Sequence, residues 1–178
     1  MIHALSERRG LRSRRSGAHR LLLVLGTLGL AACGSDGGAS SDGLPAAALV
    51  SLHDGSTLGA EDIAGPAVVN LWATWCGPCR EELPAFQEVH EELDGTVRFV
   101  GVNQGDASDA VAEYLAEVGV DFDQYLDEDG ALSDGLRITG LPATAFVAAN
   151  GTLMEVHSGQ LTADELRELV ATELGVGS

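Results

Sequence analysis

The sequence of 178 residues contains no lysine, so all ten of its basic residues are arginine. Six of these arginines lie between residues 8 and 20, a stretch that has no acidic residue. After residue 32 the chain has four arginines against 26 acidic residues, a net formal charge of −22. A surface this acidic repels the phosphate groups of nucleic acids. The charge therefore argues against nucleic-acid binding.

Cysteines are also scarce, and no apolar run is long enough to cross a bilayer. Three cysteines are too few for a small fold that several disulfides hold together. The apolar run at residues 21–32 is short of the roughly 20 residues that a membrane-spanning helix needs. Hydrophobic residues still make up 45% of the chain, which excludes a wholly disordered protein. These observations predict one acidic domain behind a basic leader.

Residues 1–32 have the pattern of a signal peptide, because basic residues precede the apolar run and Cys33 follows it directly. Leu30 is not the small residue that an ordinary cleavage site has three positions before the cut. The junction Leu30-Ala31-Ala32-Cys33 instead resembles the lipobox of bacterial lipoproteins. That resemblance implies cleavage before Cys33, lipid on its sulfur, and anchoring at the extracytoplasmic face of the cell membrane. The alternative is a free secreted protein that begins near Cys33.

Residues 33–43 are predicted to be a flexible tether, because they are rich in glycine and serine and have no large apolar residue. Residues 44–178 then form a domain long enough for one hydrophobic core. Strands that alternate with helices and end in a hairpin predict an α/β fold with a mixed sheet. Residue patterns predict a hairpin at 48–58, strands at 67–73, 97–102, 122–126, 143–148 and 152–157, and helices at 76–93, 107–118, 131–137 and 162–174.

The predicted chemistry centres on Cys76-Gly77-Pro78-Cys79, which follows the first buried strand and begins its helix. Free backbone N–H groups and the helix dipole stabilise an anion at a first helical turn, which favours a thiolate at Cys76. A free cysteine with a pKa near 8.5 is only about 3% thiolate at pH 7. Cys79 lies on the same helix face, close enough to form or resolve a disulfide with Cys76. The spacing therefore predicts dithiol–disulfide exchange.

A zinc site and a purely structural disulfide are the other uses of such a pair. A zinc site needs two more ligands, but the sequence has no second CxxC and no HxxxH pattern, and Cys33 belongs to the leader. We predict that His53, His90 and His157 are surface or turn histidines. A structural disulfide across four residues would stabilise the chain little. We therefore expect no metal and no cofactor other than the redox-active disulfide itself.

Residues 69–84 (VNLWATWCGPCREELP) and 140–144 (GLPAT) resemble the thioredoxin superfamily, in particular its membrane-tethered TlpA/ResA-like thiol–disulfide oxidoreductases. Residues 54–65 resemble that family's N-terminal hairpin, and residues 107–137 resemble its central insertion. The resemblance covers residues 44–174 and implies a thioredoxin-like fold. In this fold a central mixed β-sheet is flanked by helices.

The resemblance also implies roles for the matched residues. Cys76 is expected to be the attacking thiolate and Cys79 the resolving cysteine. Pro142 matches the cis-proline that lies beside the cysteine pair in this fold. A cis bond there would leave the backbone of Leu141 free to pair with an extended substrate segment.

Other residues of the motif are expected to bind substrate or to support the pair. Trp75, Gly77 and Pro78 are expected at the exposed rim where a substrate docks. Arg80 is the only cation near the pair, where it either helps to keep the thiolate ionised or is a solvated side chain. Pro84 should kink the helix, because proline removes a hydrogen-bond donor and clashes with the preceding turn.

The acid–base residues depart from the pattern of thioredoxin itself. Thioredoxin has a buried aspartate six residues before its first cysteine, and this chain has Asn70 there. Glu82, three residues after Cys79, matches an active-site glutamate of ResA-like proteins. It lies one helical turn from Cys79 and could take the proton of that thiol, directly or through water. Alternatively, Glu82 is a solvated helix charge, as we expect the other glutamates of this helix to be.

The predicted function is extracytoplasmic thiol–disulfide exchange. Gly-Pro between the cysteines and the TlpA/ResA-like resemblance favour reduction of disulfides in exported proteins, with apocytochrome c maturation as the leading expectation. A membrane thiol-transporting electron donor would re-reduce the pair, and we expect a monomer. The alternative is an extracytoplasmic disulfide oxidase or isomerase. A copper-delivery protein would need a longer cysteine spacing and a downstream histidine, and a peroxidase would use one peroxidatic cysteine in a different local frame.

Overall fold

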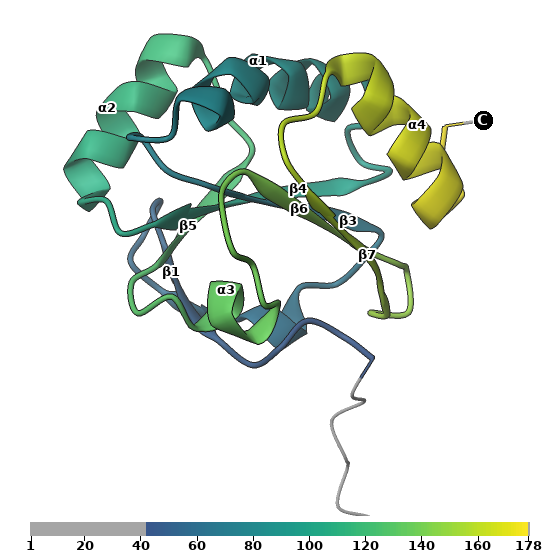
Figure 1. Ribbon diagram of the computed structural model, residues 1–178, viewed down its shortest axis with the longest axis horizontal. Helices are drawn as coiled ribbons and strands as arrows, with labels where there is room; N and C mark the ends of the chain where they lie inside the picture. Colours follow the sequence, from purple (N-terminus) through teal and green to yellow (C-terminus); the bar gives the residue numbers. More distant parts are fainter. Residues whose placement is uncertain (1–41, 178) are drawn as a thin grey trace, which may run out of the picture. The chain divides into compact units, whose positions relative to one another are not determined.

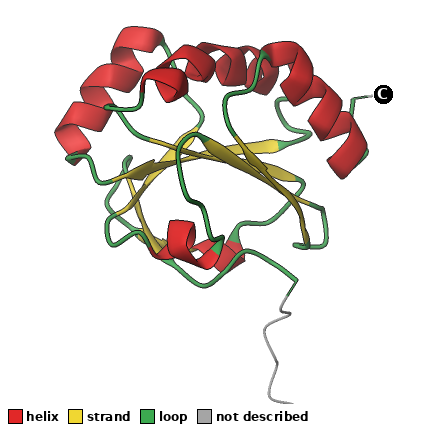
Figure 2. Ribbon diagram, in the orientation of Figure 1, coloured by secondary structure: helices red, strands yellow, loops and turns green. Residues whose placement is uncertain are grey.

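A computed structural model describes residues 42–177, which form a seven-stranded sheet with helices on both faces (Figure 1). The strands are β1 (Ala48–Ser51), β2 (Thr57–Gly59), β3 (Ala67–Trp72), β4 (Arg98–Gln104), β5 (Asp123–Asp127), β6 (Ala143–Val147) and β7 (Leu153–Ser158). The helices are α1 (Gly77–Glu92), α2 (Ser108–Val118), α3 (Ala131–Gly135), α4 (Ala163–Leu174) and the short 3₁₀ helix η1 (Ala60–Asp62). Helices α1, α2 and α4 cover one face, and α3 lies on the other (Figure 2). The predicted thioredoxin-like α/β fold is therefore confirmed.

The strands follow the order β2-β1-β5-β4-β3-β6-β7 across the sheet. Strands β3, β4 and β5 are parallel, whereas β6 pairs antiparallel with β3 and β7 with β6. The predicted N-terminal hairpin is present as β1 and β2, and β1 pairs antiparallel with β5. This order places β3 near the middle of the sheet, so the end of β3 is supported on both sides.

Strand β3 is buried along its whole length, as its apolar sequence predicts. Val68 and Trp72 pack in the core beneath the three-helix face. Val69 and Leu71 pack in the second core, on the side of η1 and α3. Complete burial of one such aliphatic side chain contributes about 1.5–3 kcal/mol to the stability of the fold. The side chains of β3 thus enter the two cores on its opposite faces, which fixes the register of the strand. It also gives α1, the helix that follows, a rigid starting point.

Most predicted boundaries differ from the observed ones by one or two residues. A capping box begins α4, because the Thr162 hydroxyl and the Glu165 carboxylate each accept a hydrogen bond from the other residue's backbone N–H. His90 is less exposed than the predicted surface histidine, with 21% of its side chain accessible to solvent. Its ring packs between Phe99 and Phe122, with ring-centre distances of 5.5 and 5.7 Å, on the buried side of α1.

The predicted signal peptide, lipid-modified Cys33 and most of the tether lie outside the described residues. Within residues 42–177, no helix is both long enough and apolar enough to span a bilayer.

Candidate active site

The cysteine pair lies where β3 ends and α1 begins. Cys76 is the N-cap residue of α1, and a disulfide joins it to Cys79 with 5.3 Å between the Cα atoms. The Cys79 backbone N–H donates a hydrogen bond of 3.3 Å to the Cys76 sulfur, so a helix-terminal donor points at that atom. Cys76 is 5% exposed and Cys79 is fully buried. Of the two residues, only Cys76 has surface that an incoming disulfide can contact.

The loop before the pair is fixed by Asp106, in the connection between β4 and α2. Its carboxylate accepts hydrogen bonds of 2.7 Å from both the backbone N–H and the hydroxyl of Thr74, and one of 2.9 Å from the Asn103 amide. Burial alone would raise the pKa of Asp106, but these hydrogen bonds outweigh it and lower the pKa. Asp106 is therefore ionised at neutral pH and holds the chain just before Cys76.

Sequence reasoning missed Asp106, although a usable signal was present. The parallel strands β3 and β4 end at the same edge of the sheet, with Trp72 opposite Asn103. A polar side chain shortly after the end of β4 therefore lies near the residues that follow β3.

The predicted cis-proline is present at the same edge. The Leu141–Pro142 peptide bond is cis. Strand β6 begins directly after it and runs antiparallel to β3, with Ala143 opposite Leu71. The cis-proline loop and the cysteine pair therefore flank the same end of two neighbouring strands.

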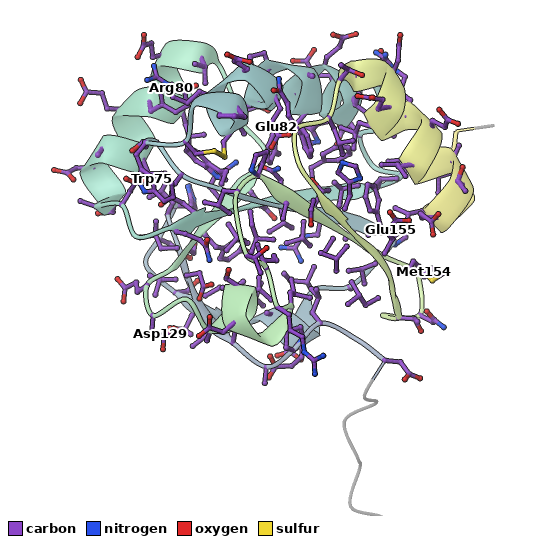
Figure 3. The ribbon with its side chains drawn as sticks, in the orientation of Figure 1. Trp75, Arg80, Glu82, Asp129, Met154 and Glu155 are labelled. Carbon is purple, nitrogen blue, oxygen red and sulfur yellow. A yellow bond between two sulfur atoms is a disulfide. The ribbon has the colours of Figure 1, made fainter. Side chains whose placement is uncertain are left out.

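The rim around the pair is formed by side chains that reach solvent. Trp75 is 69% exposed, and it is one of only two large hydrophobic side chains that are exposed in residues 42–177. Gly77, Pro78 and Arg80 are also exposed. Figure 3 shows the disulfide near Trp75 and Arg80, at one end of α1. In the part of the chain that the structure describes, no cluster of three or more potential metal ligands is present.

Glu82 is fully buried on the inner side of α1. The alternative prediction, a solvated charge on the helix surface, is therefore wrong for this residue. Its carboxylate oxygens accept hydrogen bonds from the Asn70 side-chain amide at 2.8 Å and from the Leu161 backbone N–H at 3.0 Å. Burial raises the pKa of Glu82 to about 7, although both hydrogen bonds lower it. A carboxyl group with this pKa can both accept and release a proton near neutral pH. Asn70 is thus a hydrogen-bond donor to the buried acid on the neighbouring helix.

Comparison with known proteins agrees with this geometry. Residues 42–156 match the AhpC/TSA family. The chain belongs to this family. The AhpC/TSA domain is 34% identical over 115 residues to the thiol-disulfide oxidoreductase ResA of Oceanobacillus iheyensis, a match that covers 64% of this chain and 60% of that relative. The chain thus spans less than two thirds of the length of ResA, and the match agrees with the predicted ResA-like resemblance.

Solved structures are similar to the AhpC/TSA domain over most of its length. One is MTB DsbF in mixed oxidized and reduced forms, with a TM-score of 0.64 and 34% identity over 70% of this chain and 92% of that chain. Another is a secreted Mycobacterium tuberculosis disulfide oxidoreductase homologous to Escherichia coli DsbE, with a TM-score of 0.63 and 25% identity. The second match covers 70% of this chain and 94% of that chain. Both similarities support the thioredoxin-like fold.

Proposed function

We propose that this domain is a thiol–disulfide oxidoreductase that reduces disulfides of exported proteins. The observation that carries the proposal is the Cys76–Cys79 disulfide itself. It lies at the start of α1, with Cys76 at the surface, Cys79 sealed, and the cis-Pro142 loop at the same edge of the sheet. This arrangement suits exchange with a partner in two separate steps.

The two steps follow from the exposures of the two cysteines. The Cys76 thiolate attacks one sulfur of the client disulfide, and the other client sulfur leaves as a thiolate. The Cys79 thiol then loses its proton and attacks the Cys76 sulfur, which releases the second client thiolate and forms the Cys76–Cys79 disulfide. Two electrons pass from the pair to the client. A second dithiol must later return them, and we assign that role to a membrane thiol-transporting donor.

We assign the proton acceptor of the second step to Glu82. It follows Cys79 by one helical turn, and both residues are fully buried, so bulk water does not reach either side chain. With a pKa of about 7, Glu82 is close to half ionised at neutral pH. It can therefore take the Cys79 proton, directly or through a bridging water, and release it afterwards.

We assign client binding to the rim. Trp75, Gly77 and Pro78 offer an exposed surface beside Cys76. The backbone of Leu141, which precedes the cis bond, is placed to pair with an extended client segment in the manner of an added strand. This mode recognises the client mainly through its main chain, so it suits several different clients.

The proposed location rests on the sequence and on the similarity to a secreted protein, and the proposed client class rests on the sequence resemblance. We propose that the protein is exported, lipid-anchored through Cys33 and monomeric, with oxidised apocytochrome c as its client. A Cys33→Ser variant should move from the membrane fraction to the extracytoplasmic soluble fraction. An oxidised peptide with the C-x-x-C-H pattern should be reduced faster than a composition-matched peptide with separated cysteines.

A Cys79→Ala variant tests the two-step mechanism and identifies clients. Cys76 should then retain its clients as mixed disulfides, because the resolving thiol is absent. The matched control is the Cys76→Ala/Cys79→Ala double variant, which should retain none. Adducts that are equally abundant in both variants would contradict the proposal.

The reduction potential of the pair decides the direction of electron flow. A reductant should have a potential near the −270 mV or so of thioredoxin. A value near the roughly −120 mV of a strong disulfide oxidant would instead support the alternative, an extracytoplasmic oxidase or isomerase.

A further inference from the structure

Pro84 leaves one backbone carbonyl of α1 without its usual hydrogen-bond donor. It lies inside the helix, and a proline has no N–H to donate to the carbonyl of Arg80 four residues earlier. The hydroxyl of Tyr114, on the neighbouring helix α2, donates a hydrogen bond of 3.3 Å to that carbonyl. The Arg80 N–H in turn donates to the Cys76 carbonyl at 3.1 Å. Arg80 therefore links the two: its N–H binds the first turn of α1 at Cys76, and its carbonyl binds Tyr114.

The ring of Tyr114 also contacts the side chain of Arg80. The guanidinium carbon of Arg80 lies 4.8 Å from the centre of the Tyr114 ring, a cation–π distance. Arg80 is otherwise exposed, so without this contact its long side chain would be free to extend into solvent. Tyr114 thus keeps a positive charge close to the first turn of α1.

Tyr114 is itself held in place by Trp72 of β3, which is in turn bound to Gln124 of β5. It is 8% exposed, and its ring centre lies 5.9 Å from that of buried Trp72. The indole N–H of Trp72 donates to the Gln124 side-chain oxygen at 3.1 Å. Gln124 occupies the space above Gly101, where any side chain at 101 would collide with it. These contacts leave Tyr114 little freedom to move away from α1.

We propose that Tyr114 is a positioning residue of the redox site, which holds the first turn of α1 through the Arg80 carbonyl and holds the Arg80 cation beside the cysteine pair. The proposal rests on the proposed thiol–disulfide exchange and adds a residue from the inserted segment to it. In this role Tyr114 acts through Arg80 and not on either sulfur atom.

Other charged groups lie on the elements that meet at this end of the domain. They are Glu81 and Glu82 on α1, Asp106 in the connection between β4 and α2, and Asp109 in the first turn of α2. The cis-proline loop at 139–142 contributes no titratable side chain. Arg80 is thus the cation that opposes these carboxylates at the site, and its loss should make the Cys76 thiolate less stable.

The hydroxyl is tested by a double-mutant cycle with Pro84. Tyr114→Phe should lower the Tm of the protein, because the Arg80 carbonyl loses its donor. In a Pro84→Ala background, residue 84 again has an N–H for that carbonyl, so Tyr114→Phe should lower the Tm much less. An equal decrease in both backgrounds would overturn this part of the proposal.

The ring is tested by the pH profile of Cys76 alkylation in the reduced protein. Arg80→Gln and Tyr114→Leu should each raise the pKa of the Cys76 thiol by about half a unit, which lowers alkylation about threefold below that pKa. The Arg80→Gln/Tyr114→Leu double variant should show no further change, because Tyr114 acts through Arg80. Tyr114→Phe retains the ring and should keep the wild-type profile. The matched control is Tyr125→Phe, since the Tyr125 hydroxyl accepts a hydrogen bond of 3.2 Å from another arginine, Arg98.

Each outcome decides the proposal. An unchanged profile in Arg80→Gln would show that this cation does not act on Cys76 and would overturn the positioning role. A lowered Tm with an unchanged profile in Tyr114→Leu would show a purely structural role. If Tyr114→Leu does not fold, an unchanged alkylation profile in Arg80→Gln still overturns the proposal, and Tyr114→Phe still tests the hydroxyl. Reduction of a model disulfide by the wild-type protein is measured in parallel, and failure of that assay alone would overturn the proposed function.

Discussion

The two halves of α1 use glutamate for opposite purposes. In the first half, Glu82 faces the sheet, and burial raises its pKa to about 7. In the second half, Glu92 lies at the surface, where a hydrogen bond from Arg167 of α4 lowers its pKa. The same residue type on one helix therefore becomes a carboxyl group with a pKa near 7 or an ion-pair partner, according to what the neighbouring elements place against it.

The largest expected effect concerns the first half of α1, which holds the cysteine pair. Cys76→Ser should lower disulfide exchange by about 10³-fold or more, because a serine hydroxyl is not an effective nucleophile without an activating base. Reduction of a model disulfide measures this directly. Arg167→Gln, in the other half, should retain wild-type exchange, and a comparable loss in both variants would contradict the division between the halves.

The next effect is the pH dependence of stability that Glu82 introduces. Between about pH 4.5 and 7 the folded protein keeps a proton that the unfolded chain has released, so the free energy of unfolding falls as pH rises. The shift corresponds to about 3 kcal/mol in total. Glu82→Gln should remove this decrease and make the protein more stable than wild type at pH 8. Denaturant unfolding at a series of pH values measures it.

The Gln variant preserves the buried hydrogen bonds. The Asn70 Oδ1 atom has no hydrogen-bond partner among the described residues. A rotated Asn70 amide can therefore accept from the new Gln side chain, while the Gln oxygen accepts from the Leu161 N–H. The same variant should slow resolution of mixed disulfides, since the amide cannot take the Cys79 proton.

Glu92→Gln is the matched control with the opposite sign. The pKa of Glu92 is lowered on folding, so its contribution to stability is present above its unfolded pKa of 4.5 and is lost as pH falls through the folded pKa. Glu92→Gln should therefore lower stability at neutral pH, where Glu82→Gln raises it. If both variants changed the free energy of unfolding at pH 8 in the same direction, the contrast between the two glutamates would be wrong.

The smallest expected effect is on the contact between α1 and α4. Arg167 forms ion pairs with Glu88, Glu92 and Asp164, and all of these side chains are partly or largely exposed. Exposed ion pairs stabilise proteins little and are screened by salt. Arg167→Gln should lower the Tm by a few degrees at low ionic strength and by less in concentrated salt. A Tm decrease that salt does not reduce would show that packing, not charge, makes this contact.

Much of the fold and the centre of the site could be predicted from local patterns. The apolar run of β3, the capping box of α4 and the Cys76–Cys79 spacing each depend on residues a few positions apart. Helical spacing also places Glu82 on the same face as Cys79 and Phe86, so its burial had a signal in the sequence. His90 lies on that face too, one turn after Phe86, and the prediction of a surface histidine overlooked this.

The contacts that set the properties of the site join segments far apart in the chain. The Leu161 N–H that binds Glu82 is 79 residues away from it, and the Tyr114 hydroxyl binds a carbonyl 34 residues earlier. No local pattern contains such pairs.

The sequence by itself determined the chemistry of this protein, because a cysteine at the first turn of a helix meets free N–H groups that its own neighbours supply. The tertiary structure alone decided which cysteine reaches solvent, which glutamate titrates near neutral pH and which tyrosine donates to the carbonyl that Pro84 cannot bind. Exposure and pKa depend on the atoms that surround a group, and in a folded chain most of those atoms come from distant residues.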